Sequence, residues 1–257
     1  MKLFDTHAHL TDEAFDGDRD AIVAAAHEGG VLGIVDVACH LDEIPATLAL
    51  AAKYPFVYAA AGMHPHVAGD TRKEHLDALS AYFDKEKKLL ALGEIGLDYH
   101  YDFAPRDVQK KWFAEQLDLA IEKNLPVVLH IREAFGDCME ILRARRGKLS
   151  GVMHCFSGSY EIAKECVELN LYIAFGGALT FKNAAKLADA AAKLPLSRIV
   201  LETDCPYMTP EPFRGRRNDP SLMRYTAKRL AAIRGIDADE AAEATYQNAL
   251  QLFSIDS

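Results

Sequence analysis

The sequence of 257 residues has few cysteines and no two of them spaced as C-x-x-C. The five cysteines are scattered and odd in number, which argues against a disulfide framework and favours free thiols in a reducing compartment. No uncharged run approaches the roughly 18 residues that a membrane-spanning helix needs. The N-terminus reaches Asp5 without the apolar stretch of a signal peptide. We therefore expect a cytoplasmic protein with no membrane segment.

The sequence also lacks an excess of positive charge. It has 29 Lys and Arg and 38 Asp and Glu, which gives a net charge of -9. An acidic protein does not attract polyanions at long range, so binding to nucleic acid would require local cations or metal ions. No linker, low-complexity stretch or charge block marks a domain boundary. Residues 1–257 are therefore expected to form one domain, which this length allows.

Short apolar segments recur along the chain, and each is followed by a segment with helical periodicity. Near-continuous hydrophobic runs are typical of parallel strands covered on both faces. Strands are expected at 2–7, 31–38, 56–62, 89–96, 126–131, 151–156, 171–177 and 198–204. Helices are expected at 18–28, 42–53, 72–87, 105–124, 134–146, 160–169, 182–193, 221–234 and 238–252.

This alternation predicts the fold class α/β, as a single (β/α)8 TIM-like barrel with its active site at the C-terminal ends of the strands. A doubly wound sheet is the alternative. It fits less well because no glycine-rich phosphate loop follows the first strand, where the chain instead reads His-Ala-His.

Ionisable residues gather at the expected C-terminal ends of the strands. They are His7, His9, Glu94, His130, His154 and Asp204. His7 and His9 are two residues apart on a strand, so both should point to the same face. Buried ionisable groups are costly unless they are paired or bind metal. The set as a whole therefore predicts bound divalent cations.

Two ions fit these residues better than one, because six ligands exceed the three that a catalytic zinc ion usually takes. A glutamate has two oxygens and can bridge two ions. Ions about 3.5–4 Å apart clamp the attacking hydroxide and a substrate oxygen between them. Mixed nitrogen and oxygen ligation suits Zn, Mn, Co or Fe, and also Mg if water fills the remaining positions; the sequence leaves the choice open.

Several motifs follow one another along the whole chain. They read "FDTHAHL", "AGMHPH", "LGEIGLDYH", "PVVLHIREA", "HCFSGS", "LETDCPYMTP" and "FRGRRNDP". Together they resemble the TatD family of metal-dependent deoxyribonucleases, within the amidohydrolase-like barrels. The resemblance implies a TIM-like barrel, a centre of two metal ions, and hydrolysis of phosphodiester bonds in DNA. No protein partner is evident, and a monomer or weak oligomer is expected.

The resemblance also implies roles for single residues. The ligands of one ion would be His7, His9 and Asp204, those of the other His130 and His154, and Glu94 would bridge the two ions. Asp204 would also accept a proton from the attacking water, and Glu94, Asp204 and His64 would form the catalytic set. His64 matches a family position that contacts phosphate, although it could be no more than a loop histidine beside Pro65.

Arginines near the expected site are candidate substrate contacts. Arg214, Arg216 and Arg217 lie in the loop after the last strand, and their guanidinium groups suit phosphate oxygens. The alternative is a solvated or salt-bridged loop. Arg132, two residues past His130, could reach a phosphate or merely orient a ligand.

Other residues near these motifs have two interpretations. Asp98 could fix the tautomer of a histidine or cap a helix. Trp112 is interpreted as core, not as a base-stacking platform. Cys155 and Cys205 each follow a proposed ligand directly. Strand alternation should turn both thiols away from the ions.

The leading hypothesis is a metal-dependent phosphodiesterase acting on DNA, as a 3′ exonuclease on single strands or ends. Nothing resembles a helix-turn-helix or zinc finger, so substrate choice should depend on shape and ends. The same ligand layout could cleave esters or amides, for example in a misacylated tRNA, although Glu94 stands where some such relatives carry a carboxylated lysine. A third hypothesis, a metal-binding scaffold without activity, conflicts with the complete ligand set.

Overall fold

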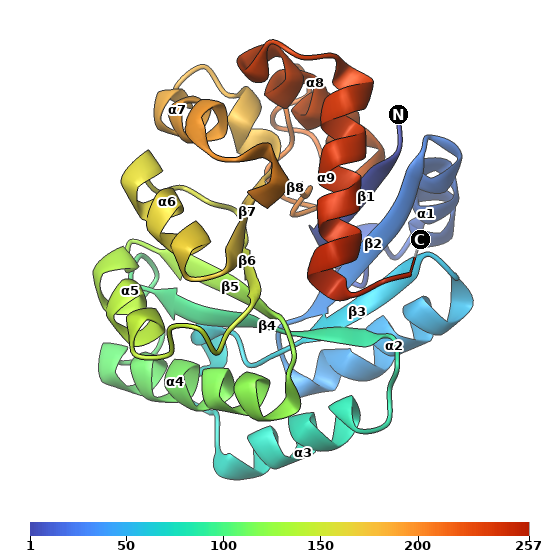
Figure 1. Ribbon diagram of the computed structural model, residues 1–257. Helices are drawn as coiled ribbons and strands as arrows, with labels where there is room; N and C mark the ends of the chain where they lie inside the picture. The colour runs from blue at the N-terminus through green and yellow to red at the C-terminus, as the bar shows by residue number, and fades with distance from the viewer. Residues whose placement is uncertain (257) are drawn as a thin grey trace.

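The computed structural model describes residues 1–256, and within them eight parallel strands form one sheet (Figure 1). The strands follow one another in sequence order from β1 to β8, with no change of direction along the sheet. Their bounds are β1 Leu3–Ala8, β2 Val31–Ala38, β3 Val57–Ala61, β4 Leu89–Asp98, β5 Val127–Arg132, β6 Gly151–Met153, β7 Leu171–Phe175 and β8 Ile199–Leu201.

The α-helices of the described residues alternate with these strands, and α9 follows α8 as an addition to the repeat. Their bounds are α1 Arg19–Glu28, α2 Ile44–Lys53, α3 Lys73–Phe83, α4 Arg106–Lys123, α5 Phe135–Arg143, α6 Tyr160–Glu168, α7 Ala185–Lys193, α8 Met223–Arg234 and α9 Ala238–Phe253. Within residues 1–256, none of these helices is long and apolar enough to cross a membrane.

Local chemistry explains where several helices begin and end. Pro105 precedes α4, and Asn124 ends it in the left-handed conformation with φ 54°. Gly235 ends α8 with φ 67°, a conformation that glycine adopts without steric cost. The predicted helix at 72–87 extended too far, because Asp84 already terminates α3.

Contacts between β1 and β8 bring the two edges of the sheet together. The backbone N–H of Asp204 donates to the carbonyl of His7 over 2.9 Å, and the Thr6 hydroxyl donates to the Leu201 carbonyl over 3.1 Å. The sheet is thus a nearly closed barrel, as predicted, and the doubly wound alternative is wrong.

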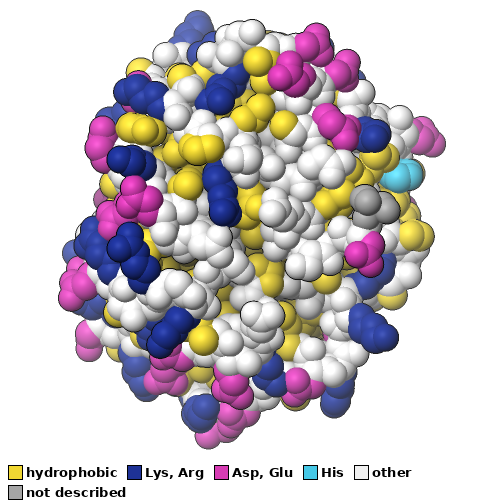
Figure 2. All heavy atoms as spheres, in the orientation of Figure 1, with side chains coloured by type: hydrophobic (Ala, Val, Ile, Leu, Met, Phe, Trp, Pro, Cys, Tyr) yellow, Lys and Arg dark blue, Asp and Glu magenta, His cyan; other side chains and the backbone are white. Residues whose placement is uncertain are grey.

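The inside of the barrel is filled by small and medium apolar side chains, among them Val37, Ala60 and Val128. Helix α9 lies across the N-terminal ends of the strands (Figure 1), and its Phe253 ring stacks on Phe4 of β1 with centroids 6.0 Å apart. On this face, charged side chains lie mostly around the periphery (Figure 2). Helix α9 therefore acts as an apolar plug at one end of the barrel.

Candidate metal centre

The opposite end of the barrel holds the histidines of the first strand. His7 belongs to β1 and is fully buried, and His9 follows just after the strand. Their Nε2 atoms lie 3.1 Å apart. The backbone of His9 donates to the carbonyl of Cys205 over 2.8 Å, which fixes this turn against the segment after β8. The prediction that both imidazoles share one face is confirmed.

Glu94 reaches the site from the middle of β4, not from its end as expected, because β4 continues to Asp98. The register between β4 and β5 shifts between Leu92 and Ile95. Such a bulge re-aims the side chain within it. Gly96 allows the close approach of β5, since a Cβ there would lie 1.9 Å from the carbonyl oxygen of His130.

The later residues of the set lie at or just beyond strand ends. His130 is inside β5, whereas His154 follows the last residue of β6 and Asp204 lies three residues past β8. Both had been expected inside their strands. Cys155 and Asp204 take positive φ angles of 42° and 57°, so the chain is not extended at these two positions.

One oxygen of Glu94 faces a group of three histidines. Oε1 lies 2.6 Å from Nδ1 of His130, 2.9 Å from Nε2 of His154 and 3.5 Å from Nε2 of His64. These residues come from β5, from the end of β6 and from the segment after β3. We call His64, His130 and His154 the Oε1 group.

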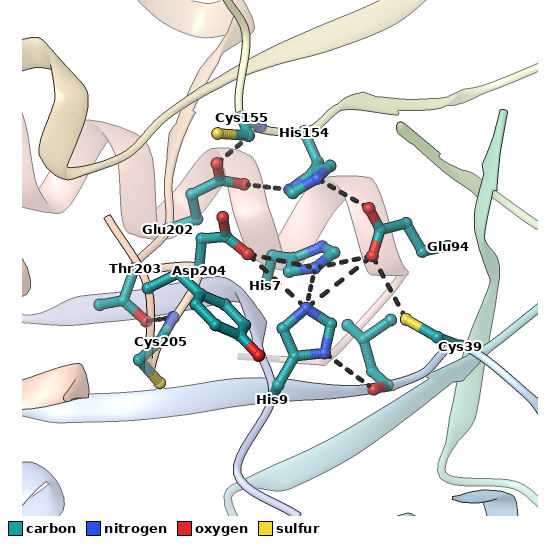
Figure 3. A network of polar contacts seen from close by, with 12 residues as sticks. His7, His9, Cys39, Glu94, His154, Cys155, Glu202, Thr203, Asp204 and Cys205 are labelled. Atoms are coloured by element: carbon teal, nitrogen blue, oxygen red, sulfur yellow. Dashed lines mark hydrogen bonds and ion pairs between the residues drawn. The ribbon is translucent and has the colours of Figure 1, made fainter. Parts of the chain in front are cut away.

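The other oxygen of Glu94 faces a different set (Figure 3). Oε2 lies 3.4 Å from Nε2 of His7, 3.8 Å from Nε2 of His9 and 3.5 Å from the thiol of Cys39. Asp204 completes this set, with Oδ1 3.6 Å from His9 Nε2. Glu94 thus stands between two groups of potential ligands, and each of its oxygens serves one of them.

Ligand atoms of His7, His9 and Asp204 all lie within 4.8 Å of one another, as do those of His64, Glu94 and His130. The first group contains the ligands that the family resemblance implies for one ion. His154 also lies close to His7, with ring centroids 3.8 Å apart, so the two groups adjoin.

The outer nitrogens of three histidines face acceptors outside the cluster. His9 Nδ1 lies 3.2 Å from the Val37 carbonyl, His130 Nε2 lies 3.1 Å from Asp98, and His154 Nδ1 lies 3.5 Å from Glu202. With a proton on each outer nitrogen, the inner nitrogen can offer a lone pair to a metal ion once its own proton has left, the usual arrangement of metal-binding histidines.

His64 has the opposite tautomer. Its Nδ1 accepts the backbone N–H of His66 over 3.1 Å, and burial lowers its pKa to about 4, so the neutral ring carries its proton on Nε2. That nitrogen faces Glu94 and offers a hydrogen, not a lone pair. Although His64 is close enough to be grouped with the ligands, its hydrogen bonds make it a donor.

The electrostatics of the cluster keep its acids ionised. Burial raises the pKa of Glu94, but the neighbouring imidazoles, His154 foremost, outweigh burial and hold the pKa well below its usual value. Burial likewise opposes ionisation of Asp204, but hydrogen bonding to His9 and nearby imidazoles lower its pKa. Among residues 1–256, only histidines lie within ion-pair distance of these two carboxylates.

This donor set fits divalent cations. Imidazole nitrogens and two ionised carboxylates converge in a largely buried cluster, and no Lys or Arg of the described chain pairs with those carboxylates. The short contacts of Glu94 with His130 and His154 need protons on the facing nitrogens. Divalent cations compete with such protons for the same lone pairs.

Sequence reasoning missed several residues around the site. Glu202 accepts the backbone N–H of Cys155 over 2.6 Å and faces His154, while His66 contacts Asp98 over 2.9 Å. Cys39 touches Glu94. Glu202 lies within the quoted "LETD" motif, and His66 within "GMHPH", so position in these motifs was the available signal.

The two cysteines that follow proposed ligands behave as expected. The thiols of Cys155 and Cys205 point away from the histidines (Figure 3). Asp98 contacts a histidine, the first of its two interpretations, and does not cap α4. Trp112 is buried in the core, only 7% exposed.

The candidate arginines are exposed and have different partners. Arg217 pairs with Asp18 at 2.6 Å and so ties two loops together, the salt-bridged alternative. Arg214 and Arg216 lie over the rings of Phe181 and Phe213 and form no ion pair within residues 1–256. The guanidinium of Arg132 lies over the ring of Tyr101, 4.7 Å from its centroid. Within the described chain, Arg132 makes no hydrogen bond to a histidine.

Comparisons with known proteins indicate the family of this chain. The family model described as TatD related DNase matches residues 4–254. YabD of Bacillus subtilis, named a metal-dependent hydrolase, is 42% identical over 98% of this chain and 99% of its own. The 3'-5' ssDNA/RNA exonuclease TatD of Citrobacter rodentium is 33% identical over 98% of both chains.

A solved structure confirms the fold. The crystal structure of YjjV, a TatD homologue from Escherichia coli K12, superposes with a TM-score of 0.93 at 35% identity, covering 99% of this chain and 98% of that one. The chain therefore belongs to the TatD family of metal-dependent hydrolases.

Proposed function

We propose that this protein is a nuclease that hydrolyses phosphodiester bonds at the 3′ ends of single-stranded DNA, using two divalent ions. The observation that carries the proposal is the position of Glu94. Its two oxygens face two separate groups of nitrogen and oxygen donors, which is what a carboxylate that bridges two ions requires.

The residues that would hold the ions are those that the family resemblance implies, and all of them lie in the cluster around Glu94. One ion would be held by His7, His9 and Asp204, and the other by His130 and His154. Glu94 would bind both ions. Bound divalent ions would polarise a phosphoryl oxygen and acidify a water molecule. Asp98 and Glu202 would keep His130 and His154 in the tautomers that this binding needs.

Asp204 is the proposed proton acceptor. Its side chain is 14% exposed, so it is the more open of the two central carboxylates, and its lowered pKa keeps it ionised at neutral pH. An ionised carboxylate at the open side of the cluster can take a proton from the attacking water. The hydrogen bond from its own N–H to the His7 carbonyl fixes the backbone of this residue.

His64 is the proposed phosphate contact, because its Nε2–H points into the site and its Nδ1 is already satisfied. A hydrogen-bond donor held there can stabilise negative charge that develops on the phosphate. Arg132, with an exposed guanidinium at the end of β5, would bind the phosphate of a neighbouring nucleotide. Arg214 and Arg216 would contribute weaker contacts from the loop after β8.

The relatives support nucleic acid as the substrate, since the TatD enzyme of Citrobacter rodentium is named for single-stranded DNA and RNA. The test is to strip the protein of metal with a chelator, restore Mg, Mn or Zn, and follow a single-stranded oligonucleotide labelled at its 5′ end. We expect stepwise shortening that depends on the metal ion.

The Asp204→Asn variant, purified in parallel, should lose this shortening, which excludes a contaminating nuclease. Aryl esters and an aminoacylated tRNA are tested beside the oligonucleotide. Cleavage of these esters, with no cleavage of the oligonucleotide by folded and metal-loaded protein, would contradict the proposal and favour an esterase using the same site.

A further inference from the structure

Two large aromatic side chains are exposed next to the candidate metal centre, where the cost of exposing apolar surface calls for an explanation. Tyr101 is 49% exposed and Phe103 is 66% exposed, and both lie in the loop between β4 and α4. Their rings stack on each other, with centroids 5.3 Å apart and planes 16° apart. They form one continuous, exposed apolar surface, which we call the aromatic platform.

The platform is held in place by buried polar contacts. The Asp98 carboxylate accepts the backbone N–H groups of His100 and Tyr101, both over 3.0 Å. The buried Gln109 side chain donates to the carbonyls of Asp98 and Ala104, at either end of the loop. These hydrogen bonds fix the loop conformation that presents the two rings.

The same contacts join the platform to the centre. The carboxylate of Asp98 that supports Tyr101 also binds Nε2 of His130, over 3.1 Å. His66 fills the space between, with its ring edge-on to Phe103 at 4.8 Å and to Tyr101 at 5.3 Å, and 6.2 Å from the ring of His130. The platform thus lies beside the Oε1 group of histidines.

Positive charge accompanies the platform. The Arg132 guanidinium lies 4.7 Å from the centroid of Tyr101 and has no acidic partner within residues 1–256. Stacked aromatic rings beside a free arginine are the combination with which proteins bind unpaired bases and their phosphates, without reading sequence. An overall acidic protein gains here the local cation that a nucleic acid requires.

We propose that the aromatic platform is a binding site for an unpaired nucleobase of a single-stranded nucleic acid, one nucleotide away from the phosphate held at the metal centre. This inference rests on the proposed nuclease function for the position of that phosphate. It assigns Tyr101 and Phe103 to stacking, and it accounts for a preference for single strands, because a paired base cannot leave its duplex to lie on the rings.

The test combines a double variant with substrates that lack single bases. Tyr101→Ser with Phe103→Ser is compared with the wild type on single-stranded oligonucleotides that carry one abasic site at successive positions from the 3′ end. We expect the double variant to raise KM about tenfold on the intact oligonucleotide, with little change in kcat. For the wild type, an abasic site at one particular position should raise KM as much as the double substitution does on the intact oligonucleotide. The same abasic site should not raise the KM of the double variant further.

The conservative variants Tyr101→Phe and Phe103→Tyr keep the rings and should retain the wild-type KM. Both positions are exposed, so folding should survive, and thermal unfolding of each variant checks this. A second readout does not need hydrolysis: the fluorescence of a 2-aminopurine base near the 3′ end should be quenched on binding to the wild type and not on binding to the double variant.

The outcomes separate this proposal from the nuclease proposal. Hydrolysis with the same KM in wild type and double variant overturns the platform and leaves the nuclease intact. Quenching that depends on the rings, without hydrolysis under any metal, supports the platform and overturns the nuclease. If the double variant instead abolishes a dimer of the wild type and leaves KM and quenching unchanged, the surface is a protein contact and the proposal is wrong.

Discussion

The two ends of the barrel are built from the same strands but from opposite kinds of side chain. On β1, Phe4 near the N-terminal end stacks on Phe253 of α9, whereas His7, three residues later, lies among imidazoles and carboxylates. One end buries apolar rings under a helix, and the other buries groups that prefer water. The apolar end must therefore supply stability that the other end does not.

This contrast predicts that substitutions at the two ends separate activity from stability. Changes at the C-terminal ends of the strands should affect metal binding and hydrolysis and leave the fold in place. Changes beneath α9 should lower the free energy of unfolding and leave the chemistry of the surviving folded protein unaltered.

The largest effect is expected for Glu94→Gln, which keeps the shape of the side chain and removes its charge. We expect hydrolysis of a single-stranded oligonucleotide to fall at least about 1000-fold, because several kcal/mol of charge stabilisation depend on a bridging carboxylate. Far-ultraviolet circular dichroism should be unchanged. Residual activity within tenfold of the wild type would contradict the bridging role.

Phe253→Ala should give the corresponding effect at the other end. Removing a ring that is only 4% exposed should lower the free energy of unfolding by about 3–5 kcal/mol. Urea denaturation measures this loss, and kcat at a temperature where the variant remains folded should match the wild type. A large fall in kcat of the folded variant would show that the two ends are coupled.

His64→Gln tests whether His64 acts as a hydrogen-bond donor and not as a metal ligand. We expect kcat to fall about 100-fold because a hydrogen bond to the phosphate is lost, while the metal content stays at the wild-type level. His130→Gln is the matched comparison and should lose metal. Loss of metal from both variants would show that His64 is a ligand after all.

The smallest of these effects is expected for Asp98→Asn, which removes the charge that fixes the tautomer of His130. Metal affinity, measured by competition with a coloured chelator, should weaken about 10–100-fold. Asp102→Asn, in the same loop but paired with the exposed Arg106, is the control and should retain wild-type affinity. Equal metal affinity in the two variants would show that Asp98 does not contribute to metal binding.

The fold could be predicted from sequence because periodicity is a local property. Alternation of apolar runs with helical segments indicated each strand and helix, and the histidines and carboxylates at strand ends converge in any parallel barrel. Glu202 and Cys39 were missed because a single acid or thiol after an apolar run has many possible surroundings. Only the closed barrel brings Glu202 to His154 and Cys39 to Glu94.

Other features lay outside what local patterns can indicate. The apolar residues of α9 show that it packs, but not that it covers the N-terminal end of the barrel. Tyr101 and Phe103 are exposed because Asp98 and Gln109 hold the loop in one conformation. The local sequence does not distinguish these two aromatic residues from buried ones. The tautomer of His64 likewise depends on a single backbone hydrogen bond.

The most direct test of the central claim, that Glu94 joins two metal sites, is the number of ions bound per folded chain. Native mass spectrometry of protein reloaded with Mn or Zn should show two ions on the wild type and fewer than two on Glu94→Gln. A single ion on active wild-type protein, or two ions retained by the variant, would contradict the account.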